Sequence, residues 1–395
     1  MAETADAIVI GGGIHGVNIA FHLARRGLKR VILLEKTAIA AGASGKTGGL
    51  IGSHFGTDIK VRLAVKAMTS WLHFGEVYGL TDQHYDRCGR IWLVPPEDLD
   101  AMRGIVEMQR ALGADARVLS GEELRELTPQ ISLDGVAGIA YEPDAGVVDG
   151  VGATSAVAEA ARQAGAKVRV GVAARAISVA GGRVRGVETD TGAISAPFVF
   201  IAANVWAPQL LEPLGVKVPV VPARAQIGLF RRPSDYGPRP PGIADFVQAN
   251  YVRDHAGGLM FVGGMDPLQE ERIPDPDSYA ETADWSVIQS YRDHVWHRFP
   301  VMRRAVFRGG YSGLYDMSPD LHPVIDRVPG VDGLFVTCGY SGDGFKYAPA
   351  VGQLLAEWAL DGQPSVDISM LSLDRFEEGH LISGRFKYAS SGWYR

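Results

Sequence analysis

Short apolar runs and a glycine turn organise the first 35 residues. Ala7–Ile10 is an apolar run that predicts a buried strand, and the glycine-rich stretch 11–16 follows it directly. Residues 17–26 carry alanine and leucine at helical spacing, which predicts a helix. A second apolar strand is predicted over 31–34 and ends at Glu35. The order strand, glycine turn, helix, strand forms a complete βαβ unit.

Periodic segments along the rest of the chain predict further helices and strands. Apolar residues at helical spacing predict helices over the segments 62–78, 97–113, 151–165 and 285–299, with a last helix running to about residue 360. Apolar or β-branched runs predict strands at 167–170, 174–179, 184–188, 198–202, 259–263 and 334–338. A second glycine turn, at 339–344, follows the last of these strands. Strand, glycine turn and helix thus recur at both ends of the chain.

Composition narrows the class of protein. Of 395 residues 49 are glycine, and eleven of these lie between positions 11 and 56, where the loop 40–56 should approach a ligand closely. The net charge of −6 argues against a nucleic-acid partner. No run of about 18 apolar residues predicts a membrane span, and no spacing predicts a metal site. Two distant cysteines and an N-terminus without a basic start favour a cytoplasmic protein.

The first glycine turn has the spacing of a dinucleotide site. In the pattern G-x-G-x-x-G, here Gly11, Gly13 and Gly16, the glycines permit a tight turn, close approach to a pyrophosphate and close packing of helix on strand. Glu35, 19 residues after Gly16, is placed to bind a ribose. Both NAD and FAD fit this pattern, so an NAD-dependent dehydrogenase stays an alternative. A site built from glycine turns near both ends of the chain, around a long cofactor, favours FAD.

Four blocks of sequence carry a resemblance that covers nearly the whole chain. They are residues 8–16 with Glu35, residues 42–49 continuing to 55–57 and 62–64, residues 141–146, and residues 317–323 leading to 339–346. In these blocks the chain resembles the D-amino acid oxidase-type family of FAD-dependent oxidoreductases. It is most similar to the group of sarcosine oxidases, dimethylglycine dehydrogenase and glycine oxidase.

The resemblance implies a fold and a division into domains. It implies an α/β protein, α+β overall, with a Rossmann-like FAD-binding domain and a substrate domain built on an antiparallel sheet. The FAD-binding domain is expected to be discontinuous, at 1–80, 145–215 and 315–375. The substrate domain is expected at 81–144 and 216–314, followed by a C-terminal tail at 376–395.

The resemblance also implies the residues that bind FAD. They are expected in the two glycine turns, the loop after the second strand and the strand ends beside them, namely Gly11, Gly13, Ile14, His15, Gly16, Glu35, Lys36, Ser44, Gly45, Thr47, Gly49, Leu50, Ala174, Ala203, Trp206, Gly342, Gly344, Phe345 and Lys346. The start of the last helix would favour negative charge on reduced flavin. By the same resemblance, Arg62 and Lys346 hold the carboxylate of a substrate.

Several positions depart from the family pattern. Thr47 and Gly313 stand where relatives have a histidine or cysteine that links to flavin, so non-covalent FAD is expected. Met260 stands where one oxidase has an oxygen-activating lysine; its loss weakens the case for an oxidase without excluding it, since other oxidases of the family lack that lysine. Asn204 replaces a glycine, and asparagine tolerates a left-handed backbone. Asp343 occupies a position that is often histidine, which would alter the charge near flavin.

The expected activity is oxidation of an amine, such as an N-alkyl or other amino acid. Hydride would leave the carbon next to nitrogen for flavin N5, giving an imine, with oxygen or another acceptor completing turnover. A second hypothesis is a flavin-binding subunit of a heteromeric amine dehydrogenase or oxidase. This alternative implies a partner subunit in addition to the small-molecule substrate.

Overall fold

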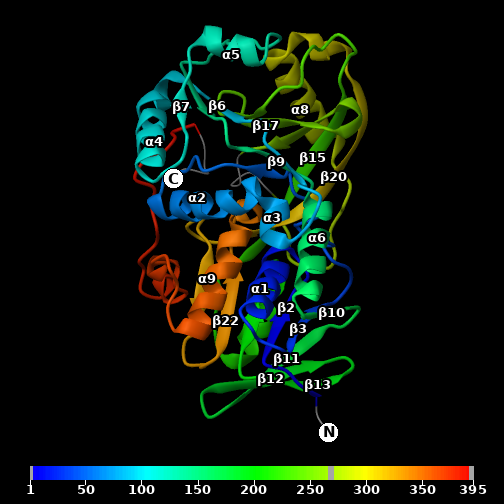
Figure 1. Ribbon diagram of the computed structural model, residues 1–395. Coiled ribbons are helices and arrows are strands. Elements are labelled where there is room, and N and C mark those ends of the chain that lie inside the picture. The colour runs from blue at the N-terminus through cyan, green and yellow to red at the C-terminus, as the bar shows by residue number, and fades with distance from the viewer. Residues whose placement is uncertain (1–2, 266–270, 391–395) are drawn as a thin grey trace.

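The computed structural model describes residues 3–265 and 271–390, so part of the predicted tail, 391–395, lies outside the described residues. The described chain forms two bodies (Figure 1). The lower body is built around a parallel sheet, and the upper body around a larger, mostly antiparallel sheet. This arrangement confirms the predicted α/β fold class.

Six strands form the lower sheet, in the order β10-β3-β2-β14-β22-β21. All neighbours pair in parallel except β21, which lies antiparallel at one edge. The bounds are β2 Ala7–Ile10, β3 Val31–Glu35, β10 Lys167–Val170, β14 Val199–Ile201, β21 Val324–Arg327 and β22 Leu334–Cys338. Three distant stretches of sequence therefore meet in one sheet.

Strand β2 shows why these strands are continuously apolar. Ala7 and Val9 belong to the core on one face of the sheet, whereas Ile8 and Ile10 belong to the core on the other face. A parallel sheet that is covered on both faces needs apolar residues at every position. The first core also contains residues of α1 (Ile14–Arg25), α6 (Gly150–Gln163) and α9 (Ala348–Asp361), and the second contains residues of α7 (Ala207–Leu211).

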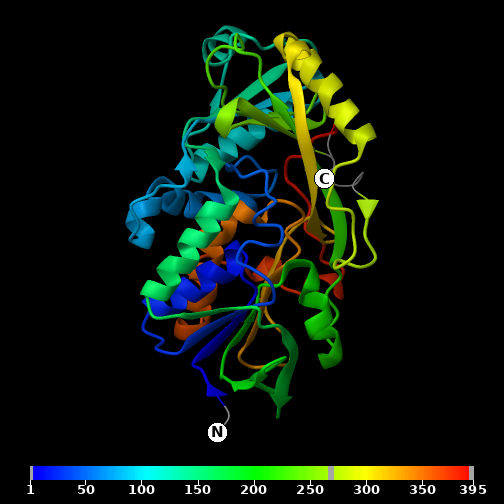
Figure 2. The ribbon, with the colours of Figure 1, turned by 90° about the vertical axis from the view of Figure 1, so that its right-hand side faces the viewer.

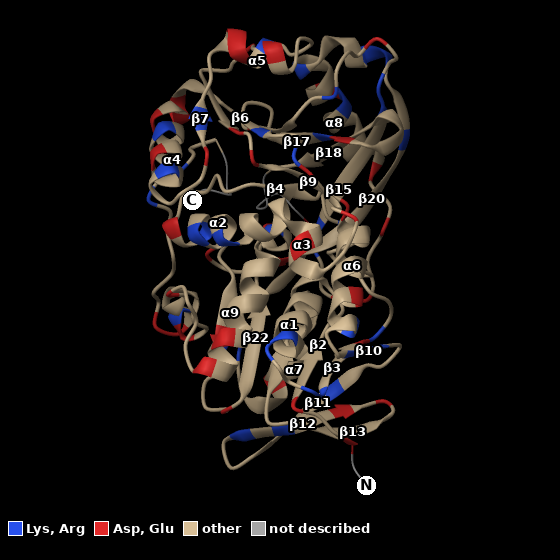
Figure 3. Ribbon diagram, in the orientation of Figure 1, with Lys and Arg blue, Asp and Glu red and all other residues tan. Residues whose placement is uncertain are grey.

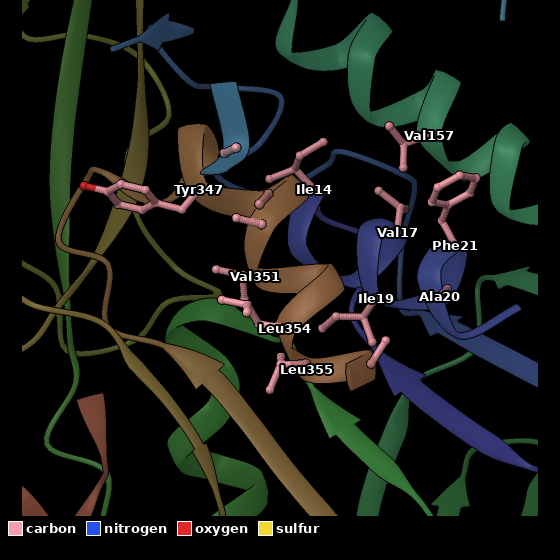
Figure 4. Close-up of a cluster of buried hydrophobic side chains, with 14 of the residues drawn as sticks. Ile14, Val17, Ile19, Ala20, Phe21, Val157, Tyr347, Val351, Leu354 and Leu355 are labelled. Carbon is pink, nitrogen blue, oxygen red and sulfur yellow. The ribbon is translucent and has the colours of Figure 1, made fainter. Parts of the chain in front are cut away.

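Helices α1 and α9 pack closely under the pocket described below. Val17 and Phe21 of α1 and Val351 and Leu354 of α9 lie in one buried cluster (Figure 4). A Cβ atom at Gly352 of α9 would stand 2.6 Å from Cβ of Asn18, so glycine permits this close contact. The packing fixes the first turns of both helices, which follow the two glycine turns.

The upper sheet has nine strands, ordered β19-β15-β18-β17-β16-β6-β8-β7, with β20 paired to β15. Only β6 and β16 pair in parallel, so the predicted antiparallel sheet is confirmed with one exception. The bounds are β6 Arg90–Val94, β7 Arg117–Val118, β8 Gly138–Glu142, β15 Val221–Arg231, β16 Gly242–Asp245, β17 Asn250–His255, β18 Leu259–Gly264, β19 Glu271–Arg272 and β20 Val306–Met317. The helices around this sheet are α4 Leu99–Ala111, α5 Gly121–Leu127 and α8 Trp285–Arg298 (Figures 1 and 2).

Two small sheets and two helices complete the described chain. One sheet contains β1 Glu3–Thr4, β11 Ala174–Ala180, β12 Arg183–Thr189 and β13 Gly192–Ser195, and the other contains β4 Leu50–Ile51, β5 Tyr85–Asp86 and β9 Gly146–Val148. The helix predicted over 62–78 is wrong in its bounds, because α2 (Asp58–Leu72) begins earlier and α3 (Phe74–Tyr78) is separate. His73, with φ −116° and ψ 36°, breaks the helix between them.

Charged residues are interspersed over both bodies. Figure 3 shows basic and acidic segments mixed along the outer helices and loops that are visible in this view. Within the described residues, no helix is both long and apolar enough to cross a membrane.

Candidate active site

A pocket of about 1300 Å³, its open mouth included, lies where the two bodies meet. The start of α1, the loop 43–50 and the turn 342–346 form one side, and the upper sheet forms the other. Ten residues predicted to bind the cofactor line it, namely Ile14, His15, Ser44, Thr47, Gly49, Leu50, Gly342, Gly344, Phe345 and Lys346. The structure thus brings both glycine turns together with the loop within residues 40–56, called the flavin loop below.

The first glycine turn has no room for a side chain at Gly11 or Gly16. Gly11 has φ +113°, and a Cβ there would stand 2.4 Å from the Ala202 carbonyl oxygen. A Cβ at Gly16 would stand 1.9 Å from the Gly11 oxygen. Close packing of α1 on β2 therefore depends on glycine. The backbone N–H of Ile14, at the helix start, donates to Oγ of Ser44 at 2.9 Å.

The acidic residue at the end of β3 lies beside the glycine turn. The carboxylate of Glu35 accepts hydrogen bonds from the backbone N–H of Gly12, at 2.7 Å, and of Thr37, at 2.8 Å. This is the place where an acid binds the ribose of a dinucleotide. Lys36 and Trp206 lie next to each other nearby, with Nζ 4.0 Å from the ring centroid. Both bind Asp277, at 2.7 and 3.0 Å.

The other predicted cofactor residues support the turns from behind. A Cβ at Gly45 would stand 2.3 Å from the Ala40 carbonyl oxygen, so this glycine is required by the loop. The Cα of Ala203 lies 3.5 Å from the point that a Cβ at Gly11 would occupy. Ala174 is half-buried at the start of β11 and does not line the pocket. Gly45 and Ala203 thus lie against the cradle, whereas the structure does not bring Ala174 to the pocket.

Asn204 provides a test of whether the cradle fits a dinucleotide. Its φ of +51° confirms the predicted left-handed backbone. Its Oδ1 is buried without a hydrogen-bond partner among the described residues, and Asn204 lines the pocket. An orphaned buried acceptor is costly unless a ligand supplies a donor. Together with the side-chain-free glycine turn and the start of α1, it fits a bound dinucleotide.

The opposite wall is a row of residues across the upper sheet. Cross-strand pairing connects Trp92, Ala244, Tyr251, Gly263 and Ile227 in sequence, from β6 through β16, β17 and β18 to β15. Side chains on directly opposed residues share one face of a sheet. Four of these five, all except Gly263, line the pocket. The sequence pattern missed this row because it does not reveal register between distant strands.

Arg90 is the buried guanidinium of this wall. It lies two residues before Trp92 on β6, and so on the same face, with its guanidinium carbon 4.7 Å from the Trp92 ring centroid. A Cβ at Gly52 would stand 3.3 Å from Nη1 of Arg90. Glycine at position 52 therefore leaves the space that the guanidinium uses. Arg90 lines the pocket but was not among the predicted residues.

The two predicted substrate residues have different surroundings. Lys346 is buried, lines the pocket and binds the carboxylate of Asp343 at 3.2 Å. Burial lowers the pKa of Lys346, and Asp343 partly offsets this. Arg62 is exposed on α2, pairs with Asp58 at 3.4 Å and does not line the pocket. The structure therefore does not bring Arg62 and Lys346 together.

A buried hydrogen-bond network lies behind Arg90 and Trp92. Burial lowers the pKa of His54 to about 3, so the ring is neutral, and its Nδ1 lies 2.9 Å from Oε1 of Gln109. Because the amide oxygen accepts, Nδ1 donates and Nε2 accepts from the Tyr388 hydroxyl at 2.6 Å. Gln109 also donates to Glu142 at 2.5 Å. The network fixes His54, which stacks on Trp92 at 4.8 Å.

The fold and the site together are those of an oxidoreductase with a Rossmann-like sheet, a mostly antiparallel sheet and a pocket lined from both. The profile of one family, the FAD dependent oxidoreductases, matches residues 6–358. The chain belongs to this family, and its cofactor is FAD. The resemblance inferred from the sequence blocks is confirmed.

Two relatives and one solved structure illustrate the similarity. Human mitochondrial sarcosine dehydrogenase is 29% identical over 95% of this chain and 42% of its own length. The 4-methylaminobutanoate oxidase (formaldehyde-forming) of Paenarthrobacter nicotinovorans is 29% identical over 94% of this chain and 46% of its own. The chain thus spans less than half the length of these relatives. The crystal structure of L-proline dehydrogenase from P. horikoshii has a TM-score of 0.89, 26% identity and coverage of 97% and 100%.

Proposed function

We propose that the chain oxidises an amine that carries a carboxylate, of the class of N-alkyl amino acids and imino acids. Sarcosine, 4-methylaminobutanoate and L-proline, which appear in the names of three similar proteins, each join a secondary amine to a carboxylate, and dimethylglycine dehydrogenase is named for a tertiary amine with a carboxylate. FAD supplies the acceptor for the hydride that leaves the carbon next to nitrogen. The protein binds and orients the substrate, and the resulting imine hydrolyses in water.

One observation carries the proposal: a buried guanidinium faces the flavin cradle across the pocket. Arg90 stands on the sheet side, and Lys346 stands on the opposite side. Arg90 lowers the pKa of Lys346 after the larger effect of burial, so the two cations influence each other. A carboxylate between them would be attracted by both cations, and an arginine can bind it in bidentate fashion. We assign Arg90 the anchoring role that the resemblance gave to Arg62.

The amine is expected to enter unprotonated. Asp343, the carboxylate that lines the pocket, is bound by two lysines, and burial lowers the pKa of His54 and of His15 to about 3. None of these groups is therefore suited to take a proton from an ammonium ion. The aromatic rings of Phe55, Trp92 and Tyr251 supply an apolar wall for the alkyl part of the substrate.

Anaerobic reduction of the flavin tests the proposal and the role of Arg90. The wild-type protein is mixed with sarcosine, 4-methylaminobutanoate, L-proline, glycine and a D-amino acid, and bleaching of the flavin absorbance is recorded. We expect bleaching by at least one secondary amine. Arg90→Met should lower kcat/KM by about tenfold to a hundredfold, because a charged hydrogen bond contributes about 1.5–3 kcal/mol.

Two further variants make the result decisive. Arg117→Met, on the exposed strand β7, removes an arginine from the same sheet outside the pocket and should behave as wild type. Arg62→Met decides between the two arginines: a loss confined to this variant would return the anchoring role to Arg62. If no amine bleaches the flavin, the proposal of amine oxidation is wrong, even if the protein contains bound FAD.

We propose that FAD is bound without a covalent link. Thr47 and Gly313 offer no nucleophilic side chain of the linking kind, and Thr47 Oγ1 accepts a hydrogen bond from the Gly49 N–H at 3.1 Å. Acid precipitation should therefore release the yellow colour into the supernatant. Colour that stays in the washed pellet would contradict this, and a covalent flavoprotein treated in parallel serves as the control.

Two kinds of electron acceptor, oxygen or another oxidant, are compatible with reoxidation of the flavin. Met260, the position compared with an oxygen-activating lysine, is fully buried in the core that contains Ile288 and Tyr291 of α8. Its side chain does not line the pocket, so methionine in place of lysine at this position does not indicate whether oxygen is the electron acceptor. Oxygen consumption measured against reduction of an artificial dye separates the two activities.

A further inference from the structure

Two buried lysines share one buried carboxylate beside the flavin cradle. Nζ of Lys60 lies 2.9 Å from Oδ2 of Asp343, and Nζ of Lys346 lies 3.2 Å from Oδ1 of the same group. The three residues are 3%, 7% and 8% exposed, in the order Lys60, Asp343, Lys346. Among the described residues, neither lysine has another acidic partner within 4 Å. The cluster therefore holds one cation more than it holds anions.

The cluster joins two elements at the edge of the pocket. Lys60 comes from α2, whereas Asp343 and Lys346 come from the turn that precedes α9. Asp343 and Lys346 line the pocket, and Lys60 lies behind them. Both ammonium groups lie near the ring of Phe55, at 5.5 and 5.2 Å from its centroid. No part of the proposed substrate chemistry uses Lys60.

The charges of the cluster depend on one another. Burial raises the pKa of Asp343, but Lys346 and Lys60 outweigh it and hold the pKa below its ordinary value, so Asp343 is an anion. Lys60 binds one oxygen of this anion and thereby reduces the negative charge that Asp343 offers to Lys346. Negative charge that develops in the pocket would favour the protonated form of Lys346. A buried surplus cation acts strongly because little water screens it.

We propose that the Lys60–Asp343–Lys346 cluster stabilises negative charge on bound FAD, with Lys60 as the positioning residue that leaves Lys346 only partly neutralised. The proposal goes beyond the proposed function, since it requires bound FAD but no particular substrate. It also assigns a role to Asp343, whose carboxylate sets how much positive charge the pocket experiences.

Sulfite binding reports the surplus positive charge beside the flavin and requires no amine substrate. Sulfite uses its lone pair to form a bond to N5 of oxidised flavin, the displaced electron pair leaves a negative charge on the ring, and the flavin absorbance is bleached. Lys60→Met removes one positive charge, and we expect it to weaken sulfite binding about tenfold. Asp343→Asn removes the negative charge and should tighten it. The double variant should return towards the wild-type affinity.

Matched variants separate charge from damage to the fold. Lys66→Met, six residues along the same helix, makes the same substitution outside the cluster and should keep the wild-type affinity. Lys60→Arg keeps the positive charge and should bind sulfite nearly as the wild type does. The flavin midpoint potential, measured on the same proteins, should fall for Lys60→Met and rise for Asp343→Asn.

Opposite shifts of the two single variants support the proposal. A Lys60→Met protein with sulfite affinity within twofold of wild type would overturn it, as would shifts of both variants in one direction. If Lys60→Met does not retain FAD, Asp343→Asn decides: tighter sulfite binding supports the proposal, and unchanged or weaker binding overturns it. Because no amine enters these measurements, their outcome is independent of whether amine oxidation is the function.

Discussion

Three glycines around the pocket leave space for a side chain from the opposite wall. A Cβ at each of them would stand 2.6 to 3.3 Å from an atom of its partner, which is too close for ordinary contact. The pairs are Gly48 with Tyr251, Gly52 with Arg90, and Gly313 with Lys46. Each pair joins the flavin loop of the lower body to the upper sheet. At the scale of residues, glycine thus decides how closely the two walls of the site approach.

Asn204 gives a prediction about backbone conformation. Its φ of +51° is a left-handed conformation, which costs other L-residues about 1–2 kcal/mol. Both Asn204→Ala and Asn204→Gly remove the orphaned amide, but only alanine is strained at this φ, so the free energy of unfolding of the FAD-free Asn204→Ala protein should be about 1 kcal/mol lower than that of Asn204→Gly. Urea unfolding followed by circular dichroism measures both, and equal stability of the alanine and glycine variants would contradict the prediction.

Elements could be predicted from the sequence where local patterns determine them. The first βαβ unit was predicted because a buried parallel strand is apolar at every position and its glycine turn has a fixed spacing. The row from Trp92 to Ile227 could not be predicted, since it depends on register between strands that lie far apart in sequence. Nothing in the local pattern of 90–94 marks Arg90 as a pocket residue.

The position of a helix start explains the difference between Arg62 and Lys60. The predicted helix began at residue 62, so Lys60 lay outside it, and Arg62 was assigned to the substrate by the resemblance alone. Helix α2 begins at Asp58 instead, so that Lys60 is buried and Arg62 faces solvent. Residues four apart lie on the same face of a helix, so the earlier start extends the buried face of α2 back from Ala64 to Lys60 and leaves Arg62 on the exposed face. A helix predicted to start too late therefore omits an inward-facing residue even where the element itself is correct.

At the scale of the whole molecule, the C-terminal segment ties the two bodies together. Arg375 pairs with Asp320 at 2.8 Å in the lower body. Asp98, in the upper body, accepts a hydrogen bond from the Ala389 N–H at 2.6 Å. Between these points, the ring of Phe386 packs against Gly104 of α4. The described part of the predicted tail, 376–390, thus packs against both bodies. A partner subunit and a cytoplasmic location stay predictions, and co-purification of a second chain would test the former.

Tyr388 gives a prediction that connects this tail to the pocket. It is fully buried, its hydroxyl donates to His54 at 2.6 Å, and its ring packs on Phe246. Tyr388→Phe should lower the free energy of unfolding by about 1–3 kcal/mol, because the buried hydrogen bond that Nε2 of His54 accepts is lost. Tyr388→Ala should cost about 3–5 kcal/mol through the cavity it leaves. Lys387→Ala, at an exposed neighbouring position, should change stability by less than about 0.5 kcal/mol.

The same variants separate a structural tail from one that also shapes the site. His54 stacks on Trp92, and Trp92 lies beneath the guanidinium of Arg90. Loss of the Tyr388 hydroxyl should therefore raise KM for a carboxylate substrate more than it lowers kcat. The reason is that Arg90, which anchors the carboxylate, moves whereas the flavin stays in place. Steady-state kinetics on Tyr388→Phe, at a temperature where it is fully folded, measure this split. Wild-type KM in a destabilised Tyr388→Phe protein would show that the tail supports the fold alone and leaves the position of Arg90 to the upper sheet.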